Sequence, residues 1–227
     1  MPRTAPQSIS AAPVVVWTAL CLPLLLVVAA CFLFIGDEAA VAAHFAQWRL
    51  AHPDALKLVK LYTDWGNPAM YLVFAAMLGL GLKRGRADLV AWALAYLAAQ
   101  LLFSLAIERV LKIGIGRPRP GVGGECIPWS LDGAHNSMPS GHTTEMSVQT
   151  GTLALFARAL LVPVLMGLLL AAMGASRLFV GAHHPSDLLG GLVLGGLGGL
   201  FASRLAPWLT PRLATFLAQR FALFGGR

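Results

Sequence analysis

The sequence predicts an all-α integral membrane protein, a bundle of six transmembrane helices that forms a single domain over residues 1–227. Two observations support this prediction. First, 57% of the 227 residues are hydrophobic and only 12% are charged, with a mean hydropathy of +0.71, whereas soluble domains have about 25% charged residues. Second, the apolar residues gather in long runs. A water-soluble core has no use for so much apolar surface, so lipid is the expected solvent.

Six apolar runs are candidates for the membrane spans, because a helix crosses the hydrocarbon region with roughly 20 apolar residues. The first run is longer than a signal-peptide core of about 7–15 residues, so we expect it to be retained. Between the fourth and fifth runs lies Arg158, and two separate helices keep this arginine out of the membrane centre. The runs are Pro13–Gly36, Pro68–Leu82, Leu89–Ile107, Thr143–Leu160, Pro163–Ala175 and Leu188–Ala206.

The distribution of charge favours a cytoplasmic N-terminus. In that orientation the inner segments hold nine Lys and Arg and one acid, whereas the outer segments hold eight Lys and Arg and nine acids. The cluster "KRGR" at 83–86 lies in a short inner loop, as the positive-inside rule expects. The net charge of +7 therefore indicates topology and contact with anionic lipid, not nucleic acid.

Three further segments have simple interpretations. The tail at about 207–227 places its large apolar residues on one helical face, which favours an interfacial helix; a frayed terminus is the alternative. The stretch 38–67 is too polar to cross and is expected on the outer surface. Cys21 and Cys31 lie in an apolar run and Cys126 in a loop, so no disulfide framework is expected.

Three short polar motifs fall on the outer side. The first is "KIGIGRPRP" at 112–120, where two prolines push the preceding arginines into extended backbone. The second is "PSGH" at 139–142, a helix start whose free N–H groups suit an anion. The third is "SRLFVGAHHPSD" at 176–187, where Asp187 follows His183 by four residues and can fix its tautomer. Alone, they are typical of a basic patch, a capped helix and a structural His–Asp pair.

Together the motifs predict a site for a dianionic, tetrahedral group. They bring three cations, two histidines and a helix N-terminus to one membrane face. Phosphoryl transfer needs charge neutralisation, a nucleophile and a proton donor. A metal site is less expected, because acids are few near the motifs and no His/carboxylate ligand set appears.

The three motifs resemble the signature of the type 2 phosphatidic acid phosphatase (PAP2) superfamily. That signature is K-x6-R-P, then P-S-G-H, then S-R-x5-H-x3-D, and every fixed position occurs here in order between 112 and 187. The resemblance implies a six-helix membrane enzyme whose outer-face loops carry the active site, with no metal and no cofactor.

The resemblance also implies a role for each matched residue. His183 would attack phosphorus and form a phosphohistidine, oriented by Asp187. His142 would protonate the leaving oxygen and then activate water. The residues that would hold the phosphoryl oxygens are Lys112, Arg119, Ser140, Gly141 and Arg177.

Several residues near the motifs have open roles. Arg117 and His184 lie outside the fixed pattern and are expected to help at most. Glu145, three residues after His142, either tunes that histidine or meets solvent. The row Gly191, Gly195 and Gly199 favours close helix packing within one bundle over a dimer seam.

The expected activity is hydrolysis of a lipid phosphate or diphosphate by a bacterial inner-membrane protein, with the site facing the periplasm. Candidate substrates are polyprenyl diphosphate, phosphatidylglycerol phosphate, phosphatidic acid and lipid A phosphate. A lipid-to-lipid phosphotransferase would use the same site. A transporter or flippase is disfavoured, because transporters place charges or broken helices near the midplane. The expected partners are the substrate and the bilayer, and the oligomeric state stays open.

Overall fold

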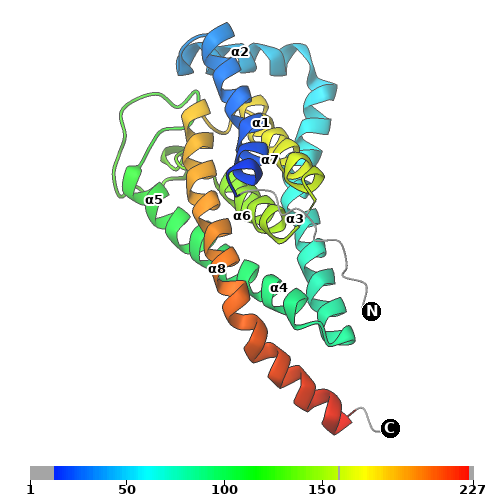
Figure 1. Cartoon of the computed structure of the whole chain (residues 1–227). Helices are drawn as coiled ribbons and strands as arrows, with labels where there is room; N and C mark the ends of the chain where they lie inside the picture. Colours follow the sequence, from blue (N-terminus) through cyan, green and yellow to red (C-terminus); the bar gives the residue numbers. More distant parts are fainter. Residues whose placement is uncertain (1–12, 158, 225–227) are drawn as a thin grey trace.

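The computed structural model describes residues 13–157 and 159–224, with side chains from 14 to 219 in these ranges. Every regular element in these ranges is helical (Figure 1). Arg3, Arg158 and Arg227, which entered the charge count, lie outside the described residues. The elements are α1 (Pro13–Phe34), α2 (Glu38–Ala51), α3 (Pro53–Arg84), α4 (Ala87–Ala99), a π-helix (Gln100–Ile107), α5 (Glu108–Ile115), a 3-10 turn (Gly133–His135), α6 (Gly141–Phe156), α7 (Leu161–Phe179) and α8 (Pro185–Phe224).

Among the described residues, five helical segments are long and apolar enough to cross a membrane, which makes the chain an integral membrane protein. Five of the six predicted runs overlap these segments. The remaining run, Thr143–Leu160, overlaps α6, which has only 16 residues and many buried polar side chains. The five segments are Val14–Phe34, Pro53–Arg84, Ala87–Ile115, Leu161–Phe179 and Pro185–Gln219.

Helix α6 lies inside the bundle and packs most extensively on α8 and α7. Glycines make the contact with α8 close. A Cβ atom placed on Gly191 would lie 2.8 Å from the carbonyl oxygen of Ser140, and one on Gly199 would lie 3.2 Å from the Cα of Gly151. The glycine row therefore serves packing within the bundle, as predicted, and it brings the start of α8 against the start of α6.

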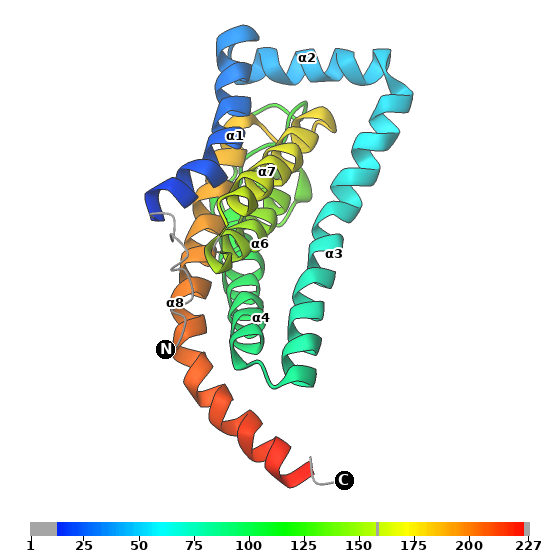
Figure 2. The ribbon, with the colours of Figure 1, turned by 45° about the vertical axis from the view of Figure 1, so that its right-hand side comes forward.

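Helix α2 crosses one end of the bundle, between the ends of α1 and α3 (Figure 2). Asp37 caps its N-terminus by accepting a hydrogen bond from the amide of Ala40 at 2.8 Å. The rings of Phe45 and Trp48 pack edge-on against Phe179 at the end of α7, each with a centroid separation of 4.6 Å. These contacts hold α2 over the loop that follows α7.

The C-terminal tail continues α8 and does not form a separate helix. The helix runs from Pro185 to Phe224 through Pro207 and Pro211 and bends away from the bundle at its end (Figures 1 and 2). Leu217 is buried and packs against the start of α4. The sequence predicts an interfacial helix for this tail, and the contact explains why the structure differs: part of the predicted apolar face packs on α4.

Candidate active site

The three motifs meet at the end of the bundle that α2 covers. The first motif runs from α5 into the loop that follows, the second opens α6, and the third joins α7 to α8. The structure brings all eight predicted site residues together there. The amide of Ser140 donates to the carbonyl oxygen of Asp187 at 3.0 Å, which ties the second motif directly to the third.

His183 and Asp187 lie side by side in the interior. The Nδ1 atom of His183 is 3.6 Å from an Asp187 carboxylate oxygen, slightly longer than a hydrogen bond. Asp187 is itself inaccessible and accepts hydrogen bonds from the hydroxyl of Ser137 at 2.6 Å and the amide of His184 at 2.8 Å. The carboxylate is therefore held rigidly beside the imidazole, with Nδ1 facing it and Nε2 left for another partner.

Arg117 is a site residue whose importance the sequence did not reveal. Its Nη1 donates to Asp187 at 2.5 Å and to the hydroxyl of Ser186 at 2.7 Å. Its other terminal nitrogen pairs with Glu38 of α2. Arg117 thus joins the loop after α5, the start of α8 and α2. The proline-flanked position was the available signal, but Glu38 lies 79 residues away in sequence, so the pairing could not be predicted.

Two of the predicted cations come from the first motif. Lys112 forms a buried ion pair with Glu108 at 3.2 Å and donates to the carbonyl oxygen of Asn136 at 3.1 Å. Arg119 donates to the carbonyl oxygens of Gly133 at 2.9 Å and Ala182 at 3.2 Å. The bond to Ala182 fixes Arg119 next to the loop that carries His183, and Arg119 also lies 3.5 Å from the Asn136 carbonyl oxygen that Lys112 contacts.

The third cation, Arg177, comes from the last turn of α7. Its Nη1 donates to the hydroxyl of Thr63 in α3 at 2.7 Å. Its Nε and the Nδ1 of His183 are both buried and have no hydrogen-bond partner among the described residues. Buried polar nitrogens normally find a partner, and an anionic oxygen supplies one for the Arg177 N–H. Thr63, like Glu108, carried no motif signal.

At the start of α6, a serine and a glycine let the side chain of Glu108 lie close to the helix backbone. Ser140 is the N-cap residue, and its hydroxyl accepts a hydrogen bond from Thr143 at 3.0 Å. A Cβ atom on Gly141 would lie 2.6 Å from a Glu108 carboxylate oxygen. A larger residue at 141 would therefore push Glu108, and with it Lys112, out of place.

Both histidines are neutral at pH 7. Burial, followed by the nearby cations Arg177 and Lys112, lowers the pKa of His142 to about 4. Burial also lowers the pKa of His183 to about 4, although Asp187 opposes this shift. A neutral imidazole has the free lone pair that a nucleophile needs. Because cations depress the pKa of His142, a bound dianion would raise it.

Glu145 is half-buried and its carboxylate bonds to side chains of α3. It accepts hydrogen bonds from the hydroxyl of Tyr71 and, at 3.0 Å, from the side-chain amide of Asn67. The same amide group lies 3.3 Å from the carbonyl oxygen of His142. Glu145 therefore does not simply meet solvent, and Asn67 links it to the backbone of the predicted acid.

Comparison with known proteins gives the following matches. The family model described as the PAP2 superfamily matches residues 89–211, which contain all three motifs. A lipid A 1-phosphatase of Rhizobium etli is 34% identical over 165 residues, covering 63% of this chain and 68% of that protein. A lipid A 1-phosphatase of Rhizobium johnstonii is 36% identical over 122 residues, covering 50% of this chain and 48% of that protein. No solved structure matches the chain.

Proposed function

The chain belongs to the PAP2 superfamily, and on that premise we propose that it is a membrane lipid phosphatase working through a phosphohistidine. One observation carries the proposal: three cations lie close to two neutral histidines, His183 buried and His142 half-buried, at one end of an apolar helical bundle. The arrangement offers positive charge, a nucleophile and a proton carrier to a phosphoryl group. A lipid substrate suits it, because the tail can stay in the membrane while the phosphate reaches the helix ends.

In the first step, Nε2 of His183 attacks phosphorus. An N–P bond forms, the P–O bond to the lipid breaks, and His142 gives its proton to the leaving oxygen. The dianionic substrate raises the pKa of His142 and so loads that proton before attack. Asp187 keeps Nδ1 of His183 directed toward itself and stabilises the charge that develops on the ring.

In the second step, water attacks the phosphohistidine. His142 accepts a proton from the water, the N–P bond breaks and inorganic phosphate leaves. Without the dianion the pKa of His142 falls again, so this residue releases the proton to solvent and both histidines return to the neutral state. Lys112, Arg119 and Arg177 neutralise the equatorial oxygens in both steps, assisted by Ser140 and the amide of Gly141. This cationic set is the basis for proposing a reaction that needs no metal.

We place the site on the outer side of a bacterial inner membrane. The "KRGR" cluster at 83–86 lies between α3 and α4, at the end of these helices away from the site (Figure 2), which supports a cytoplasmic location for that loop. In this arrangement α6 is the fourth of six crossings and adds to the five long apolar segments, shielded from lipid by its neighbours. The named relatives support a phosphorylated lipid A substrate, with polyprenyl diphosphate, phosphatidylglycerol phosphate and phosphatidic acid as further candidates.

The test is phosphate release by the purified chain in detergent from these four lipids, with and without a chelator. His183→Gln is expected to lower the rate at least about 10³-fold, roughly 4 kcal/mol of barrier. His44→Gln is the matched control, because His44 is exposed on α2 and is expected to keep the wild-type rate. Full activity in His183→Gln would refute the mechanism. Loss of activity with chelator would refute metal independence, and transfer of label to a second lipid would indicate a phosphotransferase.

A further inference from the structure

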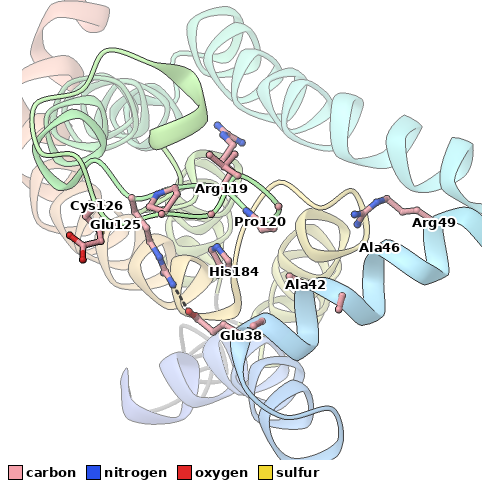
Figure 3. A pocket seen from close by; sticks show the side chains of 17 residues that line it. Glu38, Ala42, Ala46, Arg49, Arg119, Pro120, Glu125, Cys126 and His184 are labelled. Carbon is pink, nitrogen blue, oxygen red and sulfur yellow. Dashed lines mark hydrogen bonds and ion pairs between the residues drawn. The ribbon is translucent and has the colours of Figure 1, made fainter.

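A cavity of about 850 Å³ lies between α2 and the loop that follows α5 (Figure 3). Its walls are one face of α2, the loop segment 117–126 and His184. Arg117, Arg119 and His184 place it directly beside the proposed phosphoryl site. Ligand sites commonly have volumes of about 300–1,000 Å³, so there is room for a headgroup larger than the phosphoryl group that reacts.

The pattern of residues along α2 creates this space. Val41 and Phe45 are buried and pack into the core. After Glu38, which is paired with Arg117, the face toward the cavity carries four alanines and then, one turn later, an arginine. Residues spaced by three and four lie on one face of a helix, and here they are Ala39, Ala42, Ala43, Ala46 and Arg49.

Arg49 extends from α2 toward the loop that carries the nucleophile (Figure 3). Its Nη1 donates to the carbonyl oxygen of Phe179 at 3.2 Å. A Cβ atom on Gly181 would lie 2.6–2.8 Å from the guanidinium, so in its present position this group packs directly against the glycine backbone. Gly181 precedes His183 by two residues, and the contact therefore sets the position of Arg49 relative to the proposed nucleophile.

Three arginines line this cavity, and Arg49 is the one with neither an acidic partner among the described residues nor a proposed role at the reacting phosphate. Arg119 donates to carbonyl oxygens through all three of its nitrogens and is assigned to the reacting phosphoryl group. A guanidinium has five N–H donors, and among the described residues Arg49 uses only Nη1. Arg117 is paired with Glu38 and Asp187. Glu125, the cavity's other acid, is exposed and directs its carboxylate away from Arg49 (Figure 3). An anion that enters the cavity thus finds an unopposed guanidinium.

We infer that Arg49 binds a second anionic group of the substrate, so that the enzyme selects lipids whose headgroup carries a further phosphate or carboxylate beyond the phosphate that reacts. This inference rests on the proposed function. The Arg49 bond to Phe179 alone would only cap α7 and hold α2. The cavity, the alanine face and the unused donors indicate a ligand in addition.

The experiment compares two lipids that differ in one group: a diphosphorylated glycolipid, and the same lipid with the distal phosphate replaced by hydroxyl. Values of kcat/KM for phosphate release are measured for wild type, Arg49→Gln, Arg49→Lys and Lys57→Gln. Lys57 is the matched control, since it is an exposed cation paired with Asp54 and does not line the cavity.

Arg49→Gln removes a charge-assisted hydrogen bond from the complex with the diphosphorylated lipid. We therefore expect this variant to lower kcat/KM about 10- to 100-fold more for the diphosphorylated lipid than for the lipid with the hydroxyl. Arg49→Lys should recover part of the difference, and Lys57→Gln should show none. An equal loss on both lipids would overturn the inference and leave Arg49 as an anchor of α2. No loss on either lipid would overturn it as well.

Equilibrium binding of the diphosphorylated lipid separates this inference from the proposed function. Absence of phosphate release by the wild type would refute the function. Weaker binding to Arg49→Gln than to wild type would still support the anionic subsite, and equal binding would reject it.

Discussion

Replacing Arg117 by glutamine tests whether its ion pair holds the proposed catalytic carboxylate in place. The Arg117 and Asp187 side chains are 18% and 0% exposed, with a 2.5 Å separation. Breaking a buried pair from one side costs about 3–5 kcal/mol. Asp187 keeps the hydrogen bonds from Ser137 and His184. We therefore expect Arg117→Gln to lower the free energy of unfolding by somewhat less, about 2–4 kcal/mol.

The chain contains a matched control for burial. Arg86 and Asp88 are also 2.5 Å apart, but their side chains are 52% and 42% exposed. Exposed pairs contribute about 0–1 kcal/mol, so Arg86→Gln should have little effect. Arg117→Lys should lie between the two, because lysine keeps the charge but lacks the planar fork that bonds to Asp187 and Glu38 together.

The assay is thermal unfolding of the purified chain in one detergent, followed by circular dichroism. For a chain of this size about 1 kcal/mol corresponds to about 2–4 °C, so Arg117→Gln should lower the midpoint by about 4–16 °C. Phosphate release should fall too, because Asp187 loses its fixed position beside His183. A midpoint for Arg117→Gln no lower than that of Arg86→Gln would refute the reasoning.

Three further perturbations test other parts of the site. Sulfate binding at pH 6 should be accompanied by proton uptake, because the pKa of His142 is about 4 in the free protein and a bound dianion raises it. Calorimetry in buffers of different ionisation enthalpy measures the number of protons taken up. Proton uptake that persists in His142→Gln would contradict the assignment. Gly191→Ala should destabilise the chain by about 1–3 kcal/mol through overpacking. Gly196→Ala is the control and should have a small effect, because its Cβ would lie 3.6 Å from the nearest atom. Equal thermal unfolding midpoints for the two variants would count against the close α6–α8 contact. Glu145→Leu leaves an N–H of the buried Asn67 amide without its acceptor and lowers the free energy of unfolding by about 1–3 kcal/mol. Glu145→Gln keeps an acceptor oxygen, so equal unfolding midpoints for these two variants would contradict the proposed bonding.

Local spacing made part of the site predictable. Asp187 follows His183 by four residues, and the helix start at "PSGH" places Ser140 and Gly141 in one turn. The structure keeps both relations. The apolar runs likewise predicted most of the long helices, because burial in lipid requires a continuous apolar segment.

Contacts between distant segments were beyond prediction. Glu38, Thr63 and Glu108 belong to three different helices, and nothing in their local sequence shows what they face. The cavity beside α2 depends on that helix lying across the end of the bundle, a direction that helical periodicity does not contain. The length of α8 was underestimated because two prolines in sequence normally indicate a helix end.

The polarity of α6 has a consequence for how the chain is made. Thr143, Thr144, Ser147, Gln149 and Thr150 are buried by protein neighbours, and the hydroxyls of Thr144 and Thr150 donate back to the helix's own carbonyl oxygens. A segment of this kind partitions poorly into a bilayer when the translocon presents it alone. Under the proposed arrangement with six crossings, we expect its release into lipid to depend on α7 and α8, which are synthesised later. The half-site with His142 and the half-site with His183 would then enter the membrane together.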